Sequence, residues 1–352
     1  MALSSDAGVR AADGAPVRSG GSELREHPAV RRWTELGLEG TEPIGIVRLQ
    51  SKAKGKVYRL AGVGPHGSNV IAKQSSRARI HQERAMYEHV LPELPISRVR
   101  YYGFVNEPET DYAWLFLEDG GGEAYSPADA QHRALAARWL GLLHTSAACL
   151  PAAAWRLPDR GPSYYLEHLR SACDTITCNL TNPALTRDDV TVLSAIVRQC
   201  EVVAAHWSVV ERFCAAMPHT LIHGDFAPKN MRVRPHGQGL TLAPFDWGSA
   251  GWGVAAADLV QWGTSTGWGY WASPDLDMYS SVVRDRWPEL AVEHLRTAAW
   301  IGKVFRCLVC VSLSAQSFAT EWVERAARNM RIYETEMRDA LQSGGWLSRG
   351  EA

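Results

Sequence analysis

The sequence predicts an α+β fold of two lobes, in which a small lobe built on an antiparallel sheet precedes a larger, mainly helical lobe. β-prone segments gather between residues 44 and 118, whereas the apolar patterns after residue 126 have helical spacing. Three consecutive glycines at 120–122 separate the two regions. Because a glycine run is flexible, we expect a hinge at 120–123, a first lobe at 25–119 and a second lobe at 124–352.

The first lobe is expected to hold five strands and one helix. Residues 1–24 precede it and are rich in Ala, Gly and Ser, so we expect them to form a disordered tail. A helical pattern opens at Glu83, between the third and fourth strands. The segments with strand character, which predict an antiparallel five-stranded sheet, are 44–50, 56–61, 69–74, 99–105 and 113–117.

A glycine motif lies between the second and third predicted strands. Gly62, Gly64 and Gly67 spell Gly-x-Gly-x-x-Gly, a pattern that binds phosphate where a strand leads into a helix. Here the motif contains Pro65 and leads into another strand. We therefore interpret it as a hairpin turn.

The second lobe begins with a helix and continues mainly with helices. Residues 126–129, Ser-Pro-Ala-Asp, are typical of a helix start, because they supply a capping side chain, a first-turn proline and a carboxylate near the positive helix end. Further helical patterns follow at 164–179, 188–216, 288–314 and 320–341.

The composition is typical of a globular protein and excludes some classes of partner. The 352 residues are 46% hydrophobic and 21% charged, with a formal net charge of −1. This balance gives no general attraction to nucleic acid or to a membrane surface, so we expect neither as a partner. The first ten residues lack an apolar core, so we expect no secretory signal, and the apolar run at 307–320 is too short to span a bilayer. We expect a cytoplasmic monomer or homodimer.

The seven cysteines do not follow the pattern of a disulfide framework, since their number is odd. Cys307 and Cys310 form a Cys-x-x-Cys within an apolar helical pattern, without a second Cys or His pair nearby. We interpret both as packing residues; a redox or metal role is the alternative.

Three side chains with oxygen donors lie at short spacings after the first helices. Asp225 follows the short apolar run 220–222, Asn230 begins a predicted hairpin, and Asp246 ends it. A hairpin brings its ends together, so Asn230 and Asp246 can face one cation. Amide and carboxylate oxygens suit Mg²⁺, and a further carboxylate near an acceptor hydroxyl can take its proton. The block therefore predicts phosphoryl transfer with Asp225 as the base.

This block resembles the catalytic and metal-binding segments of the aminoglycoside phosphotransferase and choline kinase family, which has a protein-kinase-like bilobal fold. The run 223–225, His-Gly-Asp, followed by Asn230, is similar to the catalytic loop of the family, and 246–248, Asp-Trp-Gly, is similar to its metal-binding segment. The resemblance implies that Asp225 serves the acceptor hydroxyl and that Asn230 and Asp246 bind Mg²⁺. It also implies that Asp258, together with His223, supports the catalytic loop.

The same resemblance implies a site for ATP or GTP in the first lobe. Lys73 on the third strand stands where the fold places a lysine that contacts the α and β phosphates. Glu83, ten residues later, is expected to pair with Lys73, because it fits the Glu-x-x-x-Tyr spacing of the family with Tyr87. Glu88 in the same helical pattern is the competing candidate.

Two further segments complete the implied nucleotide site. The turn after the first strand carries Lys52 and Lys54 and would cover the phosphates, although it has a single glycine. The linker that begins with Glu118 and Asp119 would bind the nucleobase through backbone groups.

The region after Asp258 is rich in aromatic residues, and the resemblance places the acceptor pocket there. Tryptophans can stack on a flat substrate or face a cation, but each could equally fill the core. The candidate residues for this pocket are Trp247, Trp268, Trp271 and Asp275.

The leading hypothesis is a small-molecule kinase that transfers the γ-phosphate of ATP or GTP to a hydroxyl of an antibiotic-like, amino-alcohol or sugar substrate. A protein acceptor is disfavoured because no Ala-Pro-Glu follows the metal-binding segment. Acidic and basic residues nearly balance in 124–352, which gives no sign of a pocket for a polycation, so choline or another metabolite stays open. The alternatives are a kinase-like nucleotide-binding protein without turnover and a structural module.

Overall fold

The computed structural model of the chain describes residues 21–38, 42–52, 55–150, 156–263, 270–320 and 323–348. Lys54, Trp268 and residues 1–20 of the expected tail lie outside these ranges, and the side chains of Lys52 and Trp271 are not described. Residues 21–24 depart from the expected tail, because they begin helix α1 (Gly21–Glu26). Leu24 is buried there against the sheet, which explains why this end of the segment is ordered.

The described residues form two compact units, of which the first contains 21–125 and 229–248 and the second contains 126–228, 249–263 and 270–348. We expected 229–248 in the second lobe. It belongs to the first unit because strand β9 (Met231–His236) pairs with the short strand β6 (Glu123–Ala124). The predicted hinge at 120–123 stays a prediction.

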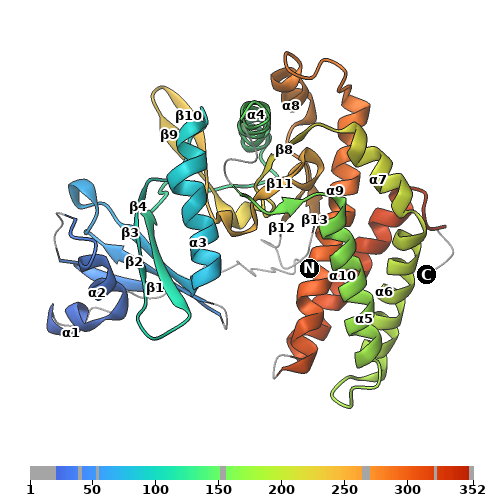
Figure 1. Ribbon diagram of the computed structural model, residues 1–352, viewed down its shortest axis with the longest axis horizontal. Coiled ribbons are helices and arrows are strands. Elements are labelled where there is room, and N and C mark those ends of the chain that lie inside the picture. The colour runs from blue at the N-terminus through green and yellow to red at the C-terminus, as the bar shows by residue number, and fades with distance from the viewer. Residues whose placement is uncertain are drawn as a thin grey trace, which may run out of the picture. The chain divides into compact units, whose positions relative to one another are not determined.

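The first unit is built on a five-stranded antiparallel sheet, as the sequence predicted (Figure 1). Its strands lie in the order β1-β2-β3-β5-β4, and every neighbouring pair is antiparallel. The bounds of these strands are β1 (Gly45–Lys52), β2 (Gly55–Ala61), β3 (Val70–Ser76), β4 (Tyr101–Asn106) and β5 (Tyr112–Glu118). The glycine motif is a turn between β2 and β3, which confirms that interpretation, and Gly62 and Gly67 there have positive φ angles of 79° and 74°.

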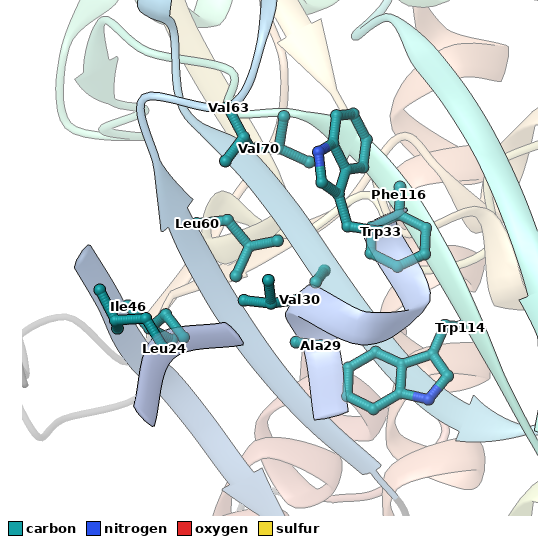
Figure 2. Close-up of a cluster of buried hydrophobic side chains, with 11 residues drawn as sticks. Leu24, Ala29, Val30, Trp33, Ile46, Leu60, Val63, Val70, Trp114 and Phe116 are labelled. Carbon is teal, nitrogen blue, oxygen red and sulfur yellow. The ribbon is translucent and has the colours of Figure 1, made fainter. Parts of the chain in front are cut away.

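The two faces of this sheet carry different helices. Alternate residues of a strand point to opposite faces, so Ala72 and Phe116, which are paired in the register, share a face. On that face they belong to one buried cluster with Val30 and Trp33 of helix α2 (Pro28–Thr34). Figure 2 shows Phe116, Val30 and Trp33 in this cluster. Lys73, the next residue along β3, therefore points to the other face, toward helix α3 (Arg77–Ala85).

Helix α3 begins earlier than the sequence indicated. We expected a helix from Glu83, but α3 starts at Arg77, directly after β3, and continues through the turns η2 (Met86–Val90) and η3 (Leu91–Glu93). Ile80 and Glu83 are the buried residues of α3. A first turn with so few apolar residues gives little periodic signal.

The second unit is mainly helical, as predicted. Its first helix starts at Ala130 rather than at Ser126, because the Asp129 carboxylate caps it by accepting bonds from the N–H groups of Gln131 and His132 at 2.7 and 3.2 Å. Its helices are α4 (Ala130–Ala147), α5 (Pro162–Asn179), α6 (Arg187–Ala205), α7 (Trp207–Ala216), α8 (Leu276–Val283), α9 (Val292–Ala315) and α10 (Val323–Ser343).

Short strands and one long helix hold the second unit together. Strand β11 (Gly251–Val254) pairs with β8 (His219–Ile222) and with β7 (Asp159–Arg160), while β12 (Gln261–Gly263) pairs with β13 (Tyr270–Ala272). Helix α9 packs on α5, α8 and α10. By length and composition alone, the stretch Val292–Ala319 could span a bilayer, with a mean hydropathy of 1.5. In the structure, 61% of its most apolar 18-residue segment is buried inside the protein.

Candidate active site

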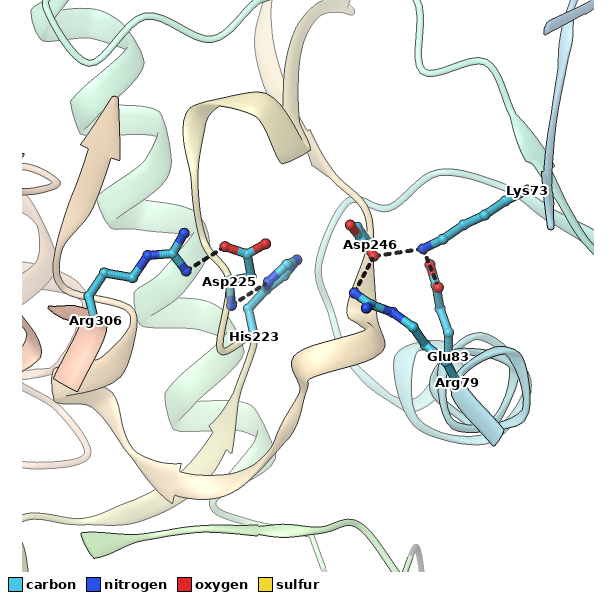
Figure 3. Close-up of polar contacts among 7 residues, drawn as sticks. All are labelled: Lys73, Arg79, Glu83, His223, Asp225, Asp246 and Arg306. Carbon is cyan, nitrogen blue, oxygen red and sulfur yellow. Dashed lines mark hydrogen bonds and ion pairs between the residues drawn. The ribbon is translucent and has the colours of Figure 1, made fainter. Parts of the chain in front are cut away.

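Lys73 bridges two carboxylates in the first unit. Its Nζ donates to Glu83 Oε2 and to Asp246 Oδ1, each at 2.6 Å (Figure 3). Lys73 comes from β3 and Glu83 from α3, while Asp246 follows strand β10 (Gly239–Pro244). Burial alone would lower the pKa of Lys73, but the two carboxylates outweigh it and raise this pKa above its usual value. Lys73 is therefore held as a cation.

Glu83, and not the competing Glu88, contacts Lys73. Glu88 instead pairs with Arg84 at 2.7 Å and accepts a hydrogen bond from the Tyr101 hydroxyl at 2.7 Å. Glu83 is fully buried, and Tyr87, one turn later, is buried on the same side of the chain. The Glu-x-x-x-Tyr spacing therefore corresponds to two inward positions, whereas Glu88 lies at the margin of the helix.

Asn230 and Asp246 lie at the two ends of the β9–β10 hairpin. The Phe245 N–H donates to the Asn230 carbonyl at 3.0 Å, directly beyond the last pair of the ladder, Met231 and Pro244. The amide oxygen of Asn230 and the carboxylate oxygens of Asp246 are ligands that suit Mg²⁺. No three His, Cys, Asp or Glu side chains gather as a metal cluster in the described ranges, so a cation here would draw its other ligands from water or phosphate oxygens.

Arg79 is a second cation near Asp246 that the sequence did not reveal. Its Nη2 lies 3.9 Å from Asp246 Oδ1. The guanidinium covers Gly248, where a Cβ atom would meet Arg79 Nε at 2.9 Å. Arg79 precedes Glu83 by one turn of α3, so both residues belong to one helix face. A cation one turn before the predicted glutamate is the signal that could have indicated it.

Asp258 braces the loop that carries Asp225 in the second unit. Its buried carboxylate accepts hydrogen bonds from the N–H groups of His223 at 2.6 Å and Gly224 at 2.9 Å. Gly224 has a φ of 73°, and a Cβ atom there would lie 2.4 Å from the Ser249 carbonyl oxygen. A side chain at position 224 would therefore displace the loop.

Two buried histidines, one within this loop and one on helix α4, make hydrogen bonds near it. His223 is buried, and its Nδ1 accepts a long hydrogen bond of 3.4 Å from the Asp225 N–H. His144 is also buried, with Nε2 3.4 Å from Asp258 Oδ2 and Nδ1 2.8 Å from the Tyr279 hydroxyl. Burial raises the pKa of Tyr279. Both histidines therefore take part in the hydrogen-bonded support of the loop.

Arg306 of α9 pairs with the side chain of Asp225. The Nη1 to Oδ1 distance is 2.6 Å, and the two side chains are 21% and 14% exposed (Figure 3). The sequence analysis did not identify Arg306. A lone cation between Phe305 and Cys307, in the apolar part of α9, is the signal that could have drawn attention to it.

The two linker residues expected near the nucleobase already have partners. Glu118 pairs with Arg234 at 2.9 Å, and Asp119 pairs with Arg59 at 2.6 Å. Their N–H groups donate to the carbonyl groups of Arg100 and Asn69. Backbone recognition of a base by these residues stays a prediction, and their N–H groups would have to leave these bonds to take part.

Two of the four residues suggested for an acceptor pocket have structural positions instead. Trp247 is fully buried, so it fills the core and cannot stack on a substrate. The Asp275 carboxylate caps α8 by accepting the Met278 N–H at 2.9 Å. Trp268 lies outside the described residues, and nothing is described of the Trp271 side chain.

Comparisons with known proteins place the chain in a family. The model of the family described as "Phosphotransferase enzyme family" matches residues 46–294. No curated protein matches the chain in sequence. A GDP complex of a mutant aminoglycoside 2′-phosphotransferase is similar in structure, with 12% identity, a TM-score of 0.58 and coverage of 86% of this chain and 94% of that one.

Two further solved structures are similar over most of their length. Choline kinase from Cryptosporidium parvum has 12% identity, a TM-score of 0.54 and coverage of 86% of this chain and 91% of its own. A microcompartment-associated aminopropanol kinase has 13% identity, a TM-score of 0.60 and coverage of 91% and 99%. The chain belongs to the phosphotransferase enzyme family, has a protein-kinase-like fold and is a nucleotide-dependent phosphotransferase.

Proposed function

We propose that the chain transfers the γ-phosphate of ATP or GTP to a hydroxyl group of a small molecule, with Mg²⁺ bound by Asn230 and Asp246 and with Asp225 as the base. The observation that carries the proposal is Lys73, whose Nζ lies 2.6 Å from both Glu83 and Asp246. A lysine paired with a helix glutamate supports the proposed contact with phosphates, and Asp246 offers a carboxylate suited to Mg²⁺.

Each residue has a defined task in the proposed reaction. Lys73 contacts the α and β phosphates, and Glu83 holds Lys73 in place. Asp225 accepts the proton of the acceptor hydroxyl while the new O–P bond forms and the bond between the γ-phosphorus and the bridging oxygen breaks, which releases the nucleoside diphosphate. Asp258 fixes the Asp225 loop through the His223 and Gly224 N–H groups. Mg²⁺, when bound, offsets the negative charge of the phosphate oxygens.

The acceptor is proposed as an antibiotic-like compound, an amino alcohol or a sugar. The similar structures are named for aminoglycosides, choline and aminopropanol, each of which carries a hydroxyl group together with a nitrogen function. A panel should therefore contain aminoglycosides, small amino alcohols, sugars and uncharged hydroxylated natural products. Nucleotide consumption with each compound, followed by detection of the phosphorylated product, identifies the acceptor.

The Asp225→Asn variant tests the assignment of the base. It should lower turnover by about 10²-fold or more, because a neutral amide cannot take the proton, while stabilisation of the protein by nucleotide is retained. The matched control is Asp285→Asn, an exposed aspartate after α8, which should turn over at the wild-type rate. Wild-type turnover by Asp225→Asn would contradict the assignment. Nucleotide binding without a product from any compound would favour a binding protein instead.

A further inference from the structure

Helix α9 brings a permanent cation to the proposed base. Arg306 Nη1 donates to Asp225 Oδ1 at 2.6 Å, a length typical of a charge-assisted hydrogen bond. Both side chains are mostly removed from water, with 21% and 14% exposed. An ion pair in such surroundings is screened less than a surface pair, so it restricts the orientation of the carboxylate more strongly.

Gly302, a glycine on the same face of α9, allows the helix to pack closely against the chain near Asp258. Gly302 lies one turn before Arg306. A Cβ atom at Gly302 would lie 2.1 Å from the Ala256 carbonyl oxygen. The helix therefore touches the backbone just before Asp258, the residue that braces the Asp225 loop. This close contact fixes α9 against the chain next to Asp258. Arg306 lies one turn further along the helix and is held in place by the same contact.

A stacked pair of rings fixes the rotation of α9 about its own axis. Phe305 lies with its ring centroid 3.7 Å from that of Tyr165 on α5, and the two ring planes differ by 1°. Phe305 and Tyr165 are both buried. Because Arg306 follows Phe305 directly, a rotation that moved Arg306 away from Asp225 would also break this stack.

From these contacts we infer that Arg306 is a positioning residue for the proposed phosphoryl transfer: it fixes the orientation of the Asp225 carboxylate and favours its ionised form. The inference rests on the proposed function of Asp225. It makes Arg306 act through Asp225, without contact to the reacting atoms. The opposite reading, in which Arg306 blocks the base and must leave it, predicts the opposite effect of removing the arginine.

Other polar groups surround the pair and bear on its charge. Burial alone would lower the pKa of Arg306, but Cys310 on α9, Asp225 and Tyr333 on α10 raise it. Burial raises the pKa of Tyr164 on α5, and Glu167 acts in the same direction, whereas Arg160 and Arg306 oppose it. The Tyr164 ring centre lies 4.3 Å from the Arg160 guanidinium and 4.6 Å from the His168 ring centre. His223, two residues before Asp225 in the loop, accepts a hydrogen bond from the Asp225 N–H.

Unfolding measurements test the pair without any acceptor. The Arg306→Gln and Asp225→Asn variants and their double variant are compared by thermal unfolding. If the two side chains are paired, the double variant should lose less in Tm than the sum of the two single losses. Arg296→Gln is the control, because Arg296 lies on the same helix in an exposed pair with Glu293 at 3.1 Å; its effect should add to that of Asp225→Asn. Additive losses for Arg306→Gln would overturn the inference.

Turnover distinguishes a positioning residue from a merely structural one. With Mg²⁺ and ATP, and water or the best panel compound as acceptor, Arg306→Gln should lower kcat by about 10²-fold, the cost of a misplaced catalytic group. The KM for ATP should stay unchanged. Arg306→Lys, which keeps the charge, should recover part of kcat. Arg296→Gln should match the wild type. An unchanged or increased kcat of Arg306→Gln would overturn the inference.

The pH profile supplies the third readout. A nearby cation favours the ionised carboxylate, so its removal lets the base become protonated at higher pH. The acidic limb of kcat should therefore move to higher pH in Arg306→Gln and should stay near its wild-type position in Arg306→Lys. A limb that does not move in Arg306→Gln would overturn the inference. Absence of Mg²⁺-dependent turnover in the wild type, with pairing intact, would instead overturn the proposed function and remove the basis of the inference.

Discussion

Lys73 lies between two carboxylates, and the buried one offers a direct test of the first unit. The Glu83→Gln variant keeps the shape of the side chain but leaves Lys73 with Asp246 alone. It should lower kcat/KM for the nucleotide by about tenfold, the effect of losing about 1.4 kcal/mol of interaction. Steady-state kinetics measure this change. Glu88→Gln, which alters a carboxylate that contacts Arg84 and Tyr101 instead, should leave kcat/KM near the wild-type value; equal losses in both variants would contradict the assignment.

The thiol of Cys173 offers a second test in the second unit. A hydrogen bond with Cys200 lowers the pKa of Cys173, although burial, Asp174 and Glu201 act in the opposite direction. A lowered pKa means more thiolate at a given pH, so Cys173 should react with iodoacetamide at lower pH than a cysteine of ordinary pKa. In Cys200→Ala the bond is lost, the pKa rises and the reaction should slow at every pH below it. Mass spectrometry of alkylated peptides measures both rates, and an unchanged rate in the variant would refute the role of this bond.

Residue spacing along the chain was sufficient to predict that Lys73 pairs with Glu83 and that Asn230 and Asp246 lie at the two ends of one hairpin, because these residues are close in the sequence. The roles of Asn230, Asp246 and Asp225 stay predictions. Residue spacing could not predict the partner of Arg306, since Asp225 is 81 residues away in the sequence. Such a contact depends on how α9 packs, and no local pattern encodes that. Trp247 was misjudged because an aromatic residue beside a polar site fits a core and a pocket equally well.

Helix α9 depends on the absence of a side chain at Gly302. In Gly302→Ala the new Cβ would approach the Ala256 carbonyl oxygen to 2.1 Å, so the helix must shift. Overpacking of this kind costs about 1–3 kcal/mol in the free energy of unfolding, and turnover should fall with it because Arg306 moves. Denaturant unfolding and kinetics measure both effects. Gly239→Ala, at a site with open space around the Cβ position, is the control and should change neither. Wild-type stability of Gly302→Ala would show that the contact is not tight.

The boundaries of elements were predicted less well than their type. The first turn of α3 has little apolar periodicity, so the helix begins before its sequence signal. The predicted helix 188–216 is divided into α6 and α7 at His206, whose φ and ψ of −100° and 8° interrupt the helical path. Apolar residues continue on both sides of this break, which hides it in the sequence. The start of α6 lies within one residue of the predicted start, at Arg187, where Thr186 and Asp189 form a reciprocal pair of hydrogen bonds that caps the helix.

Nucleotide should stabilise the whole molecule, since a ligand that binds only the folded state shifts unfolding by mass action. At a concentration of 100 times its Kd the gain is about 2.7 kcal/mol. We expect a rise in Tm with ATP and Mg²⁺ together and a much smaller rise with ATP and a chelator. Thermal unfolding measures both. Asp285→Asn should behave as the wild type. A rise in Tm with ATP that does not depend on Mg²⁺ would contradict the proposed metal ligands.

At the scale of the molecule, the separation of β-prone segments before residue 118 from helical patterns after residue 126 was enough to predict an antiparallel sheet followed by a helical region. The exception is 229–248, which joins the first unit through a strand of two residues, β6. Two residues carry no detectable strand pattern. The membership of this hairpin therefore followed from its pairing in three dimensions and not from its position in the chain.

The backbone at Asp246 has a φ of 68°, a left-handed conformation that few residues with a Cβ adopt readily. Asparagine tolerates this conformation well, so Asp246→Asn removes a charge without straining the backbone. Any loss of Mg²⁺-dependent stabilisation by ATP in this variant is then due to the missing carboxylate and not to a displaced chain. This single dihedral angle thus makes position 246 suited to separating the contribution of a charge from that of the fold.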